Sequence, residues 1–314
     1  MRIAIIDIGT NTFNLLIQES KTNRLILKNK ISVRLGEGGL VNNQLHPEAM
    51  ARGLAALKEH KKTILENKVD SCFAFATSAV RGADNGKEFA ENVAIETGIK
   101  INILSGDSEA YLIYEGVKLL YDFGKPYSLI MDIGGGSTEF ILANSEGVKW
   151  QKSYDLGVSR LIQLFNPSDI IKEEEVEKIY HYLDKEISEL IEVCKKFPPT
   201  ELIGSSGSFD TFAQMIFERH QYPIDLEKTL KYNFKIQDYS EISGLMLSRN
   251  FEERLNTPGM IPMRADLIVL ACVLVNHSLD RLAISNLKLS TYALKEGVFK
   301  TLEKENIPWQ ESLL

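Results

Sequence analysis

Two short stretches decide how this chain folds: RIAIIDIGTNTF at residues 2–13 and SLIMDIGGGSTE at residues 128–139. Each is a nearly continuous apolar run that ends in Asp-Ile-Gly and continues through small and hydroxylated residues. An apolar run of this kind is typical of a buried strand, and the glycines that follow it predict a tight turn. The chain therefore contains an internal duplication. Two copies of one α/β unit facing each other would bring their turns together across a central cleft.

Each copy continues with return strands and then with alternating helices and strands. In the first copy we expect strands at 13–18, 25–35, 69–76 and 99–104, and helices from Pro47, at 87–97 and at 107–120. In the second copy we expect strands at 138–143, 148–155, 201–203 and 282–290, a long helix through 176–191, further helices after residue 209, and a last helix at 292–304. Gly124 and Pro126 suit a hinge between the copies. The expected first domain is therefore 1–124, with a C-terminal helix at about 300–314 packing back on it, and the expected second domain is 125–299.

The composition excludes several classes of protein. The 314 residues are 44% hydrophobic and 25% charged, which is normal for a globular chain of two domains. The net charge of −7 gives no general support for binding nucleic acid, and no apolar run approaches a membrane span. Three scattered cysteines and a start at Met1 without a signal peptide predict a cytoplasmic protein with free thiols.

The two turns carry the candidate chemistry. Glycines let a backbone approach an anion closely, and successive N–H groups can form an anion-binding nest. The expected phosphate-binding residues are Gly9, Thr10, Asn11, Thr12, Gly134, Gly135, Gly136, Ser137 and Thr138. Asp7 and Asp132, at the strand ends, are placed to hold Mg²⁺ or its waters. A single such turn is more often a plain hairpin whose Asp is a capping acceptor. The matched pair favours a site that binds phosphate groups.

The motifs, in this order and spacing, resemble the exopolyphosphatase and guanosine pentaphosphate phosphohydrolase family over essentially the whole chain. They are DIGTNTF at 7–13, TSAVR at 77–81, SGDSEA at 105–110, DIGGGSTE at 132–139, GSSGS at 204–208 and MRAD at 263–266. The resemblance implies two ribonuclease-H-like α/β domains of the sugar kinase, heat-shock and actin-like superfold, facing a central cleft. It also implies hydrolysis of a phosphoanhydride bond.

The resemblance assigns roles residue by residue. Glu109 matches the catalytic acid that activates water, and Arg81 matches an arginine that holds substrate phosphate. Asp132 and Glu139 match catalytic acids by the metal, so that Asp7, Asp132 and Glu139 are the expected metal ligands for Mg²⁺, with Mn²⁺ as the alternative ion. The residues of a possible nucleotide-like turn are Gly204, Ser205, Ser206, Gly207 and Ser208. Without the resemblance, a surface ion pair is the usual role of an arginine such as Arg81, but its place shortly after the strand at 69–76 favours the site. Glu109 alone could be a carboxylate that is merely favourable at a helix start.

This chain departs from the family in two respects, and the sequence leaves more than one function open. Many relatives carry two adjacent glutamates where this chain has Ser108 and Glu109, and long relatives add C-terminal helices with a histidine-aspartate signature that is not found in these 314 residues. The leading function is Mg²⁺-dependent release of the terminal phosphate of polyphosphate. The close alternative is hydrolysis of the 5′-phosphate of guanosine pentaphosphate. A kinase of the same superfold and a non-catalytic phosphate or alarmone sensor are more distant. Expected partners are thus the polyphosphate or guanosine pentaphosphate substrate and a second copy of the chain as a homodimer, without nucleic acid or membrane.

Overall fold

The computed structural model describes residues 1–225, 228–302, 309, 311 and 312.

The first copy of the repeat forms a five-stranded mixed sheet. The strand order is β3-β2-β1-β4-β5, in which β1, β3, β4 and β5 run in one direction and β2 alone is antiparallel to them. The strands are β1 (Arg2–Ile8), β2 (Thr12–Glu19), β3 (Leu25–Ser32), β4 (Ser71–Ala76) and β5 (Ile101–Ile103).

The second copy forms a six-stranded sheet with the same core topology. Its order is β10-β11-β9-β6-β7-β8, so that β8-β7-β6-β9-β11 repeats β3-β2-β1-β4-β5, and β10 is added antiparallel at the far edge. The strands are β6 (Tyr127–Ile133), β7 (Thr138–Asn144), β8 (Gly147–Tyr154), β9 (Pro199–Ser205), β10 (Lys231–Phe234) and β11 (Leu287–Ser290). The duplication predicted from the two Asp-Ile-Gly turns is therefore confirmed.

Helices cover both faces of the sheets. Those of the first copy are α1 (Pro47–Glu66), α2 (Ser78–Arg81), α3 (Gly86–Thr97) and α4 (Gly106–Lys118). Those of the second are α5 (Val158–Phe165), α6 (Glu173–Glu186), α7 (Ser188–Lys196), α8 (Gly207–His220), α9 (Ile236–Ser248), α10 (Phe251–Leu255), the 3₁₀ turn Pro262–Arg264, α11 (Ile268–Arg281) and α12 (Leu294–Leu302). Among the described residues no helix is long and apolar enough to cross a membrane.

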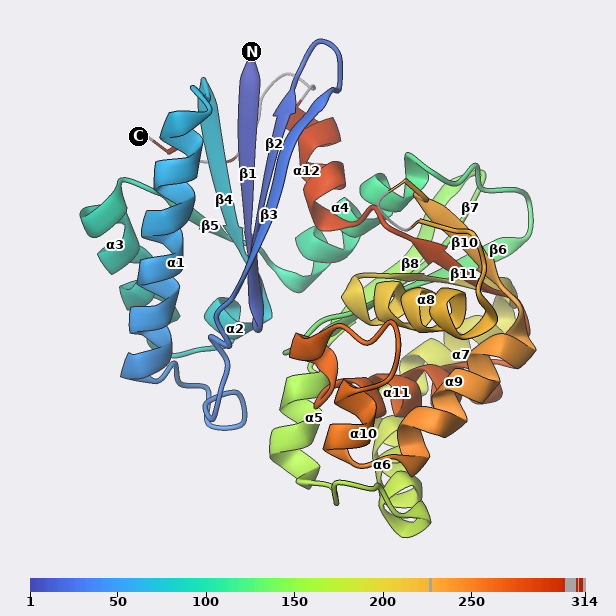
Figure 1. The fold of residues 1–314 in the computed structure, drawn as a ribbon. Coiled ribbons are helices and arrows are strands. Elements are labelled where there is room, and N and C mark those ends of the chain that lie inside the picture. Colours follow the sequence, from blue (N-terminus) through green and yellow to red (C-terminus); the bar gives the residue numbers. More distant parts are fainter. Residues whose placement is uncertain (226–227, 303–308, 310, 313–314) are drawn as a thin grey trace.

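Strand β1 shows how alternation distributes its side chains between two cores. Ala4, Ile6 and Ile8 pack with α1 and α3 on the outer face of the first sheet. Ile3 and Ile5 face the opposite way, because successive side chains of a strand point to opposite faces. They join a cluster that contains residues of α4, of α12 and of the second sheet. Helices α4 and α12 therefore lie between the two sheets (Figure 1), which places the start of α4 beside the cleft.

Two expectations need correction. The long helix predicted through 176–191 is two helices, because the backbone at Ile187 leaves helical geometry, with φ −96° and ψ 19°. The apolar spacing continues across this break, so periodicity could not reveal it. The strand expected from 282 starts at Leu287, since α11 runs to Arg281. The last helix, expected at 292–304, begins at Leu294 and packs on α4 and β1 of the first domain as expected; most of the segment 300–314 lies outside the described residues.

Candidate active site

The two glycine turns close with the same hydrogen bond. The amide N of Gly9 donates to the carbonyl of Thr12 at 3.1 Å, and the amide N of Gly134 donates to the carbonyl of Ser137 at 3.0 Å. Both turns follow the first strand of their copy, which runs in the middle of its sheet. The sequence match between the two turns is therefore also a match of backbone geometry.

The carbonyl groups of both turns accept hydrogen bonds from backbone amides of other segments. In the first turn, Thr10 O accepts from Gly36 N at 3.1 Å, and Asn11 O accepts from two amides of the segment after β3. In the second, Gly135 O accepts from Ser159 N and Arg160 N at 2.9 and 3.1 Å at the start of α5. Carbonyls satisfied in this way do not repel an anion in the cleft, which is what an anion-binding turn of backbone amides requires.

The turns contact each other across the domain boundary. A Cβ atom at Gly135 would lie 2.6 Å from Asn11 Nδ2, and one at Gly136 would lie 2.9 Å from Thr10 Oγ1. Only glycine permits this close approach. Residues of both turns line one cleft of about 1200 Å³, to which Gly9 and Gly135 both contribute, as the repeat predicted. The two-domain arrangement around a shared cleft is thus confirmed.

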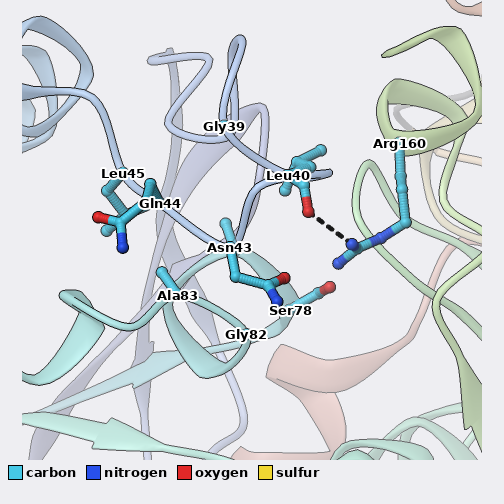
Figure 2. Close-up of a pocket in the computed structure, with 10 residues that line it drawn as sticks. Gly39, Leu40, Asn43, Gln44, Leu45, Ser78, Gly82, Ala83 and Arg160 are labelled. Carbon is cyan, nitrogen blue, oxygen red and sulfur yellow. Dashed lines mark hydrogen bonds between the residues drawn. The ribbon is translucent and has the colours of Figure 1, made fainter. Parts of the chain in front are cut away.

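Arg160 of α5 holds the two domains together beside the turns. Its Nε donates to Gly136 O at 2.9 Å, and its Nη1 donates to Leu40 O of the first domain at 2.7 Å (Figure 2). Gln163, one turn later, both donates to Gly36 O and accepts from Leu40 N, at 2.9 and 3.0 Å. The second phosphate turn is therefore fixed to the first domain through α5.

Glu109 points into the cleft from the first turn of α4. Ser105 caps this helix by accepting from Ser108 N, and Asp107 is exposed while Glu109 is buried. Arg81, at the end of α2, pairs with Glu109 through Nη1 and Oε2 at 2.5 Å. Burial raises the pKa of Glu109 well above its ordinary value and the charge of Glu139 raises it further, while Arg81 lowers it. Glu109 is therefore a proton acceptor of increased basicity, oriented by a cation.

Asp132 and Glu139 are direct cross-strand partners on β6 and β7. Asp132 accepts from Ser205 Oγ at 2.6 Å, and Glu139 accepts from Ser153 Oγ at 2.6 Å. Burial is the main cause that raises the pKa of Asp132 to about 6 and that of Glu139 to about 7, and each carboxyl also feels a neighbouring acid. On the opposite wall, Asp7 accepts from Asn14 Nδ2 at 3.0 Å, and burial raises its pKa too.

These carboxylates fit a divalent cation only in part. Within the described chain no group of three or more His, Cys, Asp or Glu side chains is close enough to hold a metal ion, so Asp7, Asp132 and Glu139 do not form a complete ligand set. Mg²⁺ commonly takes one or two carboxylates and completes its shell with water and substrate phosphate. Buried acids that raise one another's pKa fit a cation of that kind.

The structure does not place every predicted residue at the cleft. The Thr138 side chain is buried and its hydroxyl donates to Leu156 O at 3.0 Å, so this hydroxyl is not directed at the cleft, where its phosphate contact was expected. Gly204 and Ser205 lie within β9, where Ser205 holds Asp132 and the Phe209 ring lies against Gly204, which leaves Ser206–Ser208 at the cleft. Arg81 is not among the lining residues, because its guanidinium is directed at Glu109 and at Leu104 O.

The sequence reasoning missed several charged residues that line the cleft. They are Lys28, Lys30, Asp210, Arg264, Lys295 and Glu296. Arg264 lies in the MRAD motif, which was noted without a role, and its guanidinium lies directly against Gly207. Lys295, in the first turn of α12, interacts electrostatically with Asp7, Asp132 and Asp210. No local pattern marks it, since only the return of α12 to the first sheet brings it there.

Two α/β domains that repeat one sheet topology and carry matched glycine turns on one cleft define a duplicated two-domain class of α/β protein. Within it, the model of the Ppx/GppA phosphatase family matches residues 16–306, and the chain belongs to that family. Its members hydrolyse phosphoanhydride bonds, and this chain is an enzyme of that class.

The relatives are similar along nearly the whole chain. The solved structure of an exopolyphosphatase from Cytophaga hutchinsonii is 36% identical, with a TM-score of 0.93 over 96% of this chain and 97% of that one. Exopolyphosphatase 1 of Mycobacterium bovis is 25% identical over 97% of this chain and 89% of its own length. A bifunctional 3-dehydroquinate synthase/phosphatase of Fusobacterium nucleatum is 34% identical over 88% of this chain, which spans only 43% of that longer protein.

Proposed function

We propose that this chain hydrolyses the terminal phosphoanhydride bond of inorganic polyphosphate and releases orthophosphate, with Mg²⁺ as the cofactor. The observation that carries the proposal is the position of Glu109, a buried carboxylate on the cleft that also contains both phosphate turns. Family membership and the named exopolyphosphatases among the relatives support it.

In the proposed reaction the terminal phosphate lies between the two turns, where backbone amides and the hydroxyls of Thr12 and Ser137 bind its oxygens. Glu109 accepts a proton from a water molecule as the oxygen of that water attacks phosphorus. The bond between phosphorus and the bridging oxygen breaks, and the shortened chain leaves with that oxygen. Such transfers depend mainly on positioning and on neutralising charge. Arg81 orients Glu109 by their 2.5 Å pair.

One or two of the carboxylates of Asp132, Glu139 and Asp7 would hold the cation, and water and phosphate oxygens would complete its coordination shell. When bound, it supplies positive charge to phosphate oxygens that otherwise repel these acids. Lys30, Lys295 and Arg264, which line the same cleft, would balance the charge of a longer polyanion.

Guanosine pentaphosphate is the alternative substrate. The cleft of about 1200 Å³ continues past the phosphate turns to Ser206–Ser208 and Arg264, which gives a nucleoside room beyond the reacting phosphate. The same acids and turns would serve both substrates. A homodimer and a cytoplasmic location stay predictions from the sequence.

A substrate panel tests the proposal. Orthophosphate release is measured from polyphosphates of several lengths, from guanosine pentaphosphate and from ATP, each with and without Mg²⁺. We expect the highest kcat/KM with polyphosphate and Mg²⁺. A higher kcat/KM with guanosine pentaphosphate would select the alternative. Absence of release from every substrate would favour a sensor.

A further inference from the structure

The hydroxyl of Ser153 connects the Arg81–Glu109 pair of the first domain with Glu139 of the second. Ser153 Oγ, on β8, accepts from Arg81 Nη2 at 3.3 Å and donates to Glu139 Oε1 at 2.6 Å. A guanidinium can only donate and an ionised carboxylate can only accept, so the direction of both bonds is fixed by the partners. The chain Glu109–Arg81–Ser153–Glu139 is therefore continuous across the domain boundary.

The backbone around Ser153 shows that this approach is close. A Cβ atom at Gly106, the first residue of α4, would lie 2.6 Å from Ser153 Cβ, so no side chain fits there without displacing the strand. Gln151, two residues earlier and on the same face of β8, donates to Asp107 O at 3.0 Å. Strand β8 thus docks on the helical turn that carries Glu109.

The contact with Ser153 also affects Glu109, because the two terminal nitrogens of Arg81 bind these two residues. Nη1 holds Glu109 while Nη2 holds Ser153, and the guanidinium is planar, so fixing one nitrogen fixes the direction of the other. Glu139 is near enough for the charge of Arg81 to lower its pKa. With the hydroxyl removed, Arg81 is free to turn toward Glu139 and away from Glu109.

We propose that Ser153 is a positioning residue, which keeps Arg81 paired with Glu109 and sets that pair relative to Glu139 across the cleft. The inference rests on the proposed function, because it concerns the step in which Glu109 takes a proton. This role does not require Ser153 to contact the substrate. The expected consequence is therefore a change in kcat rather than in KM.

The experiment compares Ser153→Ala with the matched control Gln151→Ala. Both variants remove one hydrogen bond of β8 to the first domain, but that of Gln151 goes to the backbone carbonyl of Asp107 and not to Arg81. A hydrogen bond to a charged group is worth enough to predict a loss in kcat of roughly 10- to 100-fold for Ser153→Ala. Its KM for linear polyphosphate should stay within about threefold, while Gln151→Ala keeps both constants near those of the unmodified chain. Ser153→Thr, which retains a hydroxyl, should recover most of the lost kcat.

The outcomes separate the inference from the proposed function. Equal kcat values in Ser153→Ala and Gln151→Ala would overturn it, since the contact would then be only structural. A raised KM with unchanged kcat in Ser153→Ala would overturn it as well, because Ser153 would then bind substrate. Failure of the unmodified chain to release orthophosphate would instead refute the proposed function, on which the inference depends.

Discussion

Replacing Glu109 with glutamine removes proton acceptance and little else. The glutamine oxygen can still accept from Arg81 Nη1, which lies 2.5 Å from the carboxylate, and the side-chain volume is almost unchanged. General-base catalysis contributes about 10²–10⁴ to turnover, so kcat should fall by that factor, equivalent to a barrier higher by roughly 3–5 kcal/mol. Binding should persist, because the glycine turns are untouched. The assay is steady-state orthophosphate release from polyphosphate, with kcat and KM determined separately.

The same variant has a predicted effect on stability. The pKa of Glu109 is raised in the folded chain, so the stability it contributes is complete below its ordinary pKa and is lost as pH rises through the raised value. Glutamine avoids that loss. Tm should therefore be equal to or higher than that of the unmodified chain at neutral pH, and an inactive variant cannot be dismissed as unfolded.

Asp107→Asn is the control for Glu109→Gln. Asp107 is exposed, the helix cap is Ser105, and the carboxylate of Asp107 lies in the first turn, where it is favourable to the helix dipole. Its loss should cost about 0.3–1 kcal/mol of stability and leave kcat unchanged. If Asp107→Asn abolished turnover while Glu109→Gln retained it, Glu109 would not be the general base. If neither change matters, the base must be sought at Glu139 or Asp132.

Three further predictions follow from the site. Arg81→Lys should lower kcat at least tenfold, since one ammonium cannot hold Glu109, Leu104 O and Ser153 together; unchanged kinetics would show that only the charge matters. Chelation of divalent cations should abolish orthophosphate release and added Mg²⁺ or Mn²⁺ should restore it, whereas full activity in excess chelator would remove the metal from the account. Burial raises the pKa of Glu139 from 4.5 to about 7, so stability is lost as pH rises through about 7. Without divalent cations, the Tm advantage of Glu139→Gln over the unmodified chain should therefore be larger at pH 8 than at pH 5, and a pH-independent difference would contradict this.

The repeated Asp-Ile-Gly turns made the fold predictable. Each turn follows an apolar strand, and two such units suffice to specify two sheets with their turns on one cleft. The same local signal placed Gly9, Gly135 and Glu139 correctly at the cleft. It failed for Thr138, because the first residue of a strand faces one side or the other and the letters alone do not say which.

Contacts between distant segments were beyond the sequence. Ser153 looks like any polar residue of an outer strand until β8 docks on α4. Lys295 follows no motif, and only the return of α12 between the sheets brings it near Asp7. The pairing of Arg81 with Glu109 was missed for the same reason, although both residues had been singled out.

The proposed reaction removes a terminal phosphate, so it requires a substrate that has a chain end. Linear polyphosphate and a cyclic metaphosphate contain the same phosphoanhydride bonds, but the cyclic compound has no terminal phosphate. Orthophosphate release is measured from both at equal phosphate concentration with Mg²⁺. We expect release from the linear chain from the first time point and none from the ring. Equal release from the ring, or none from the linear chain, would contradict it.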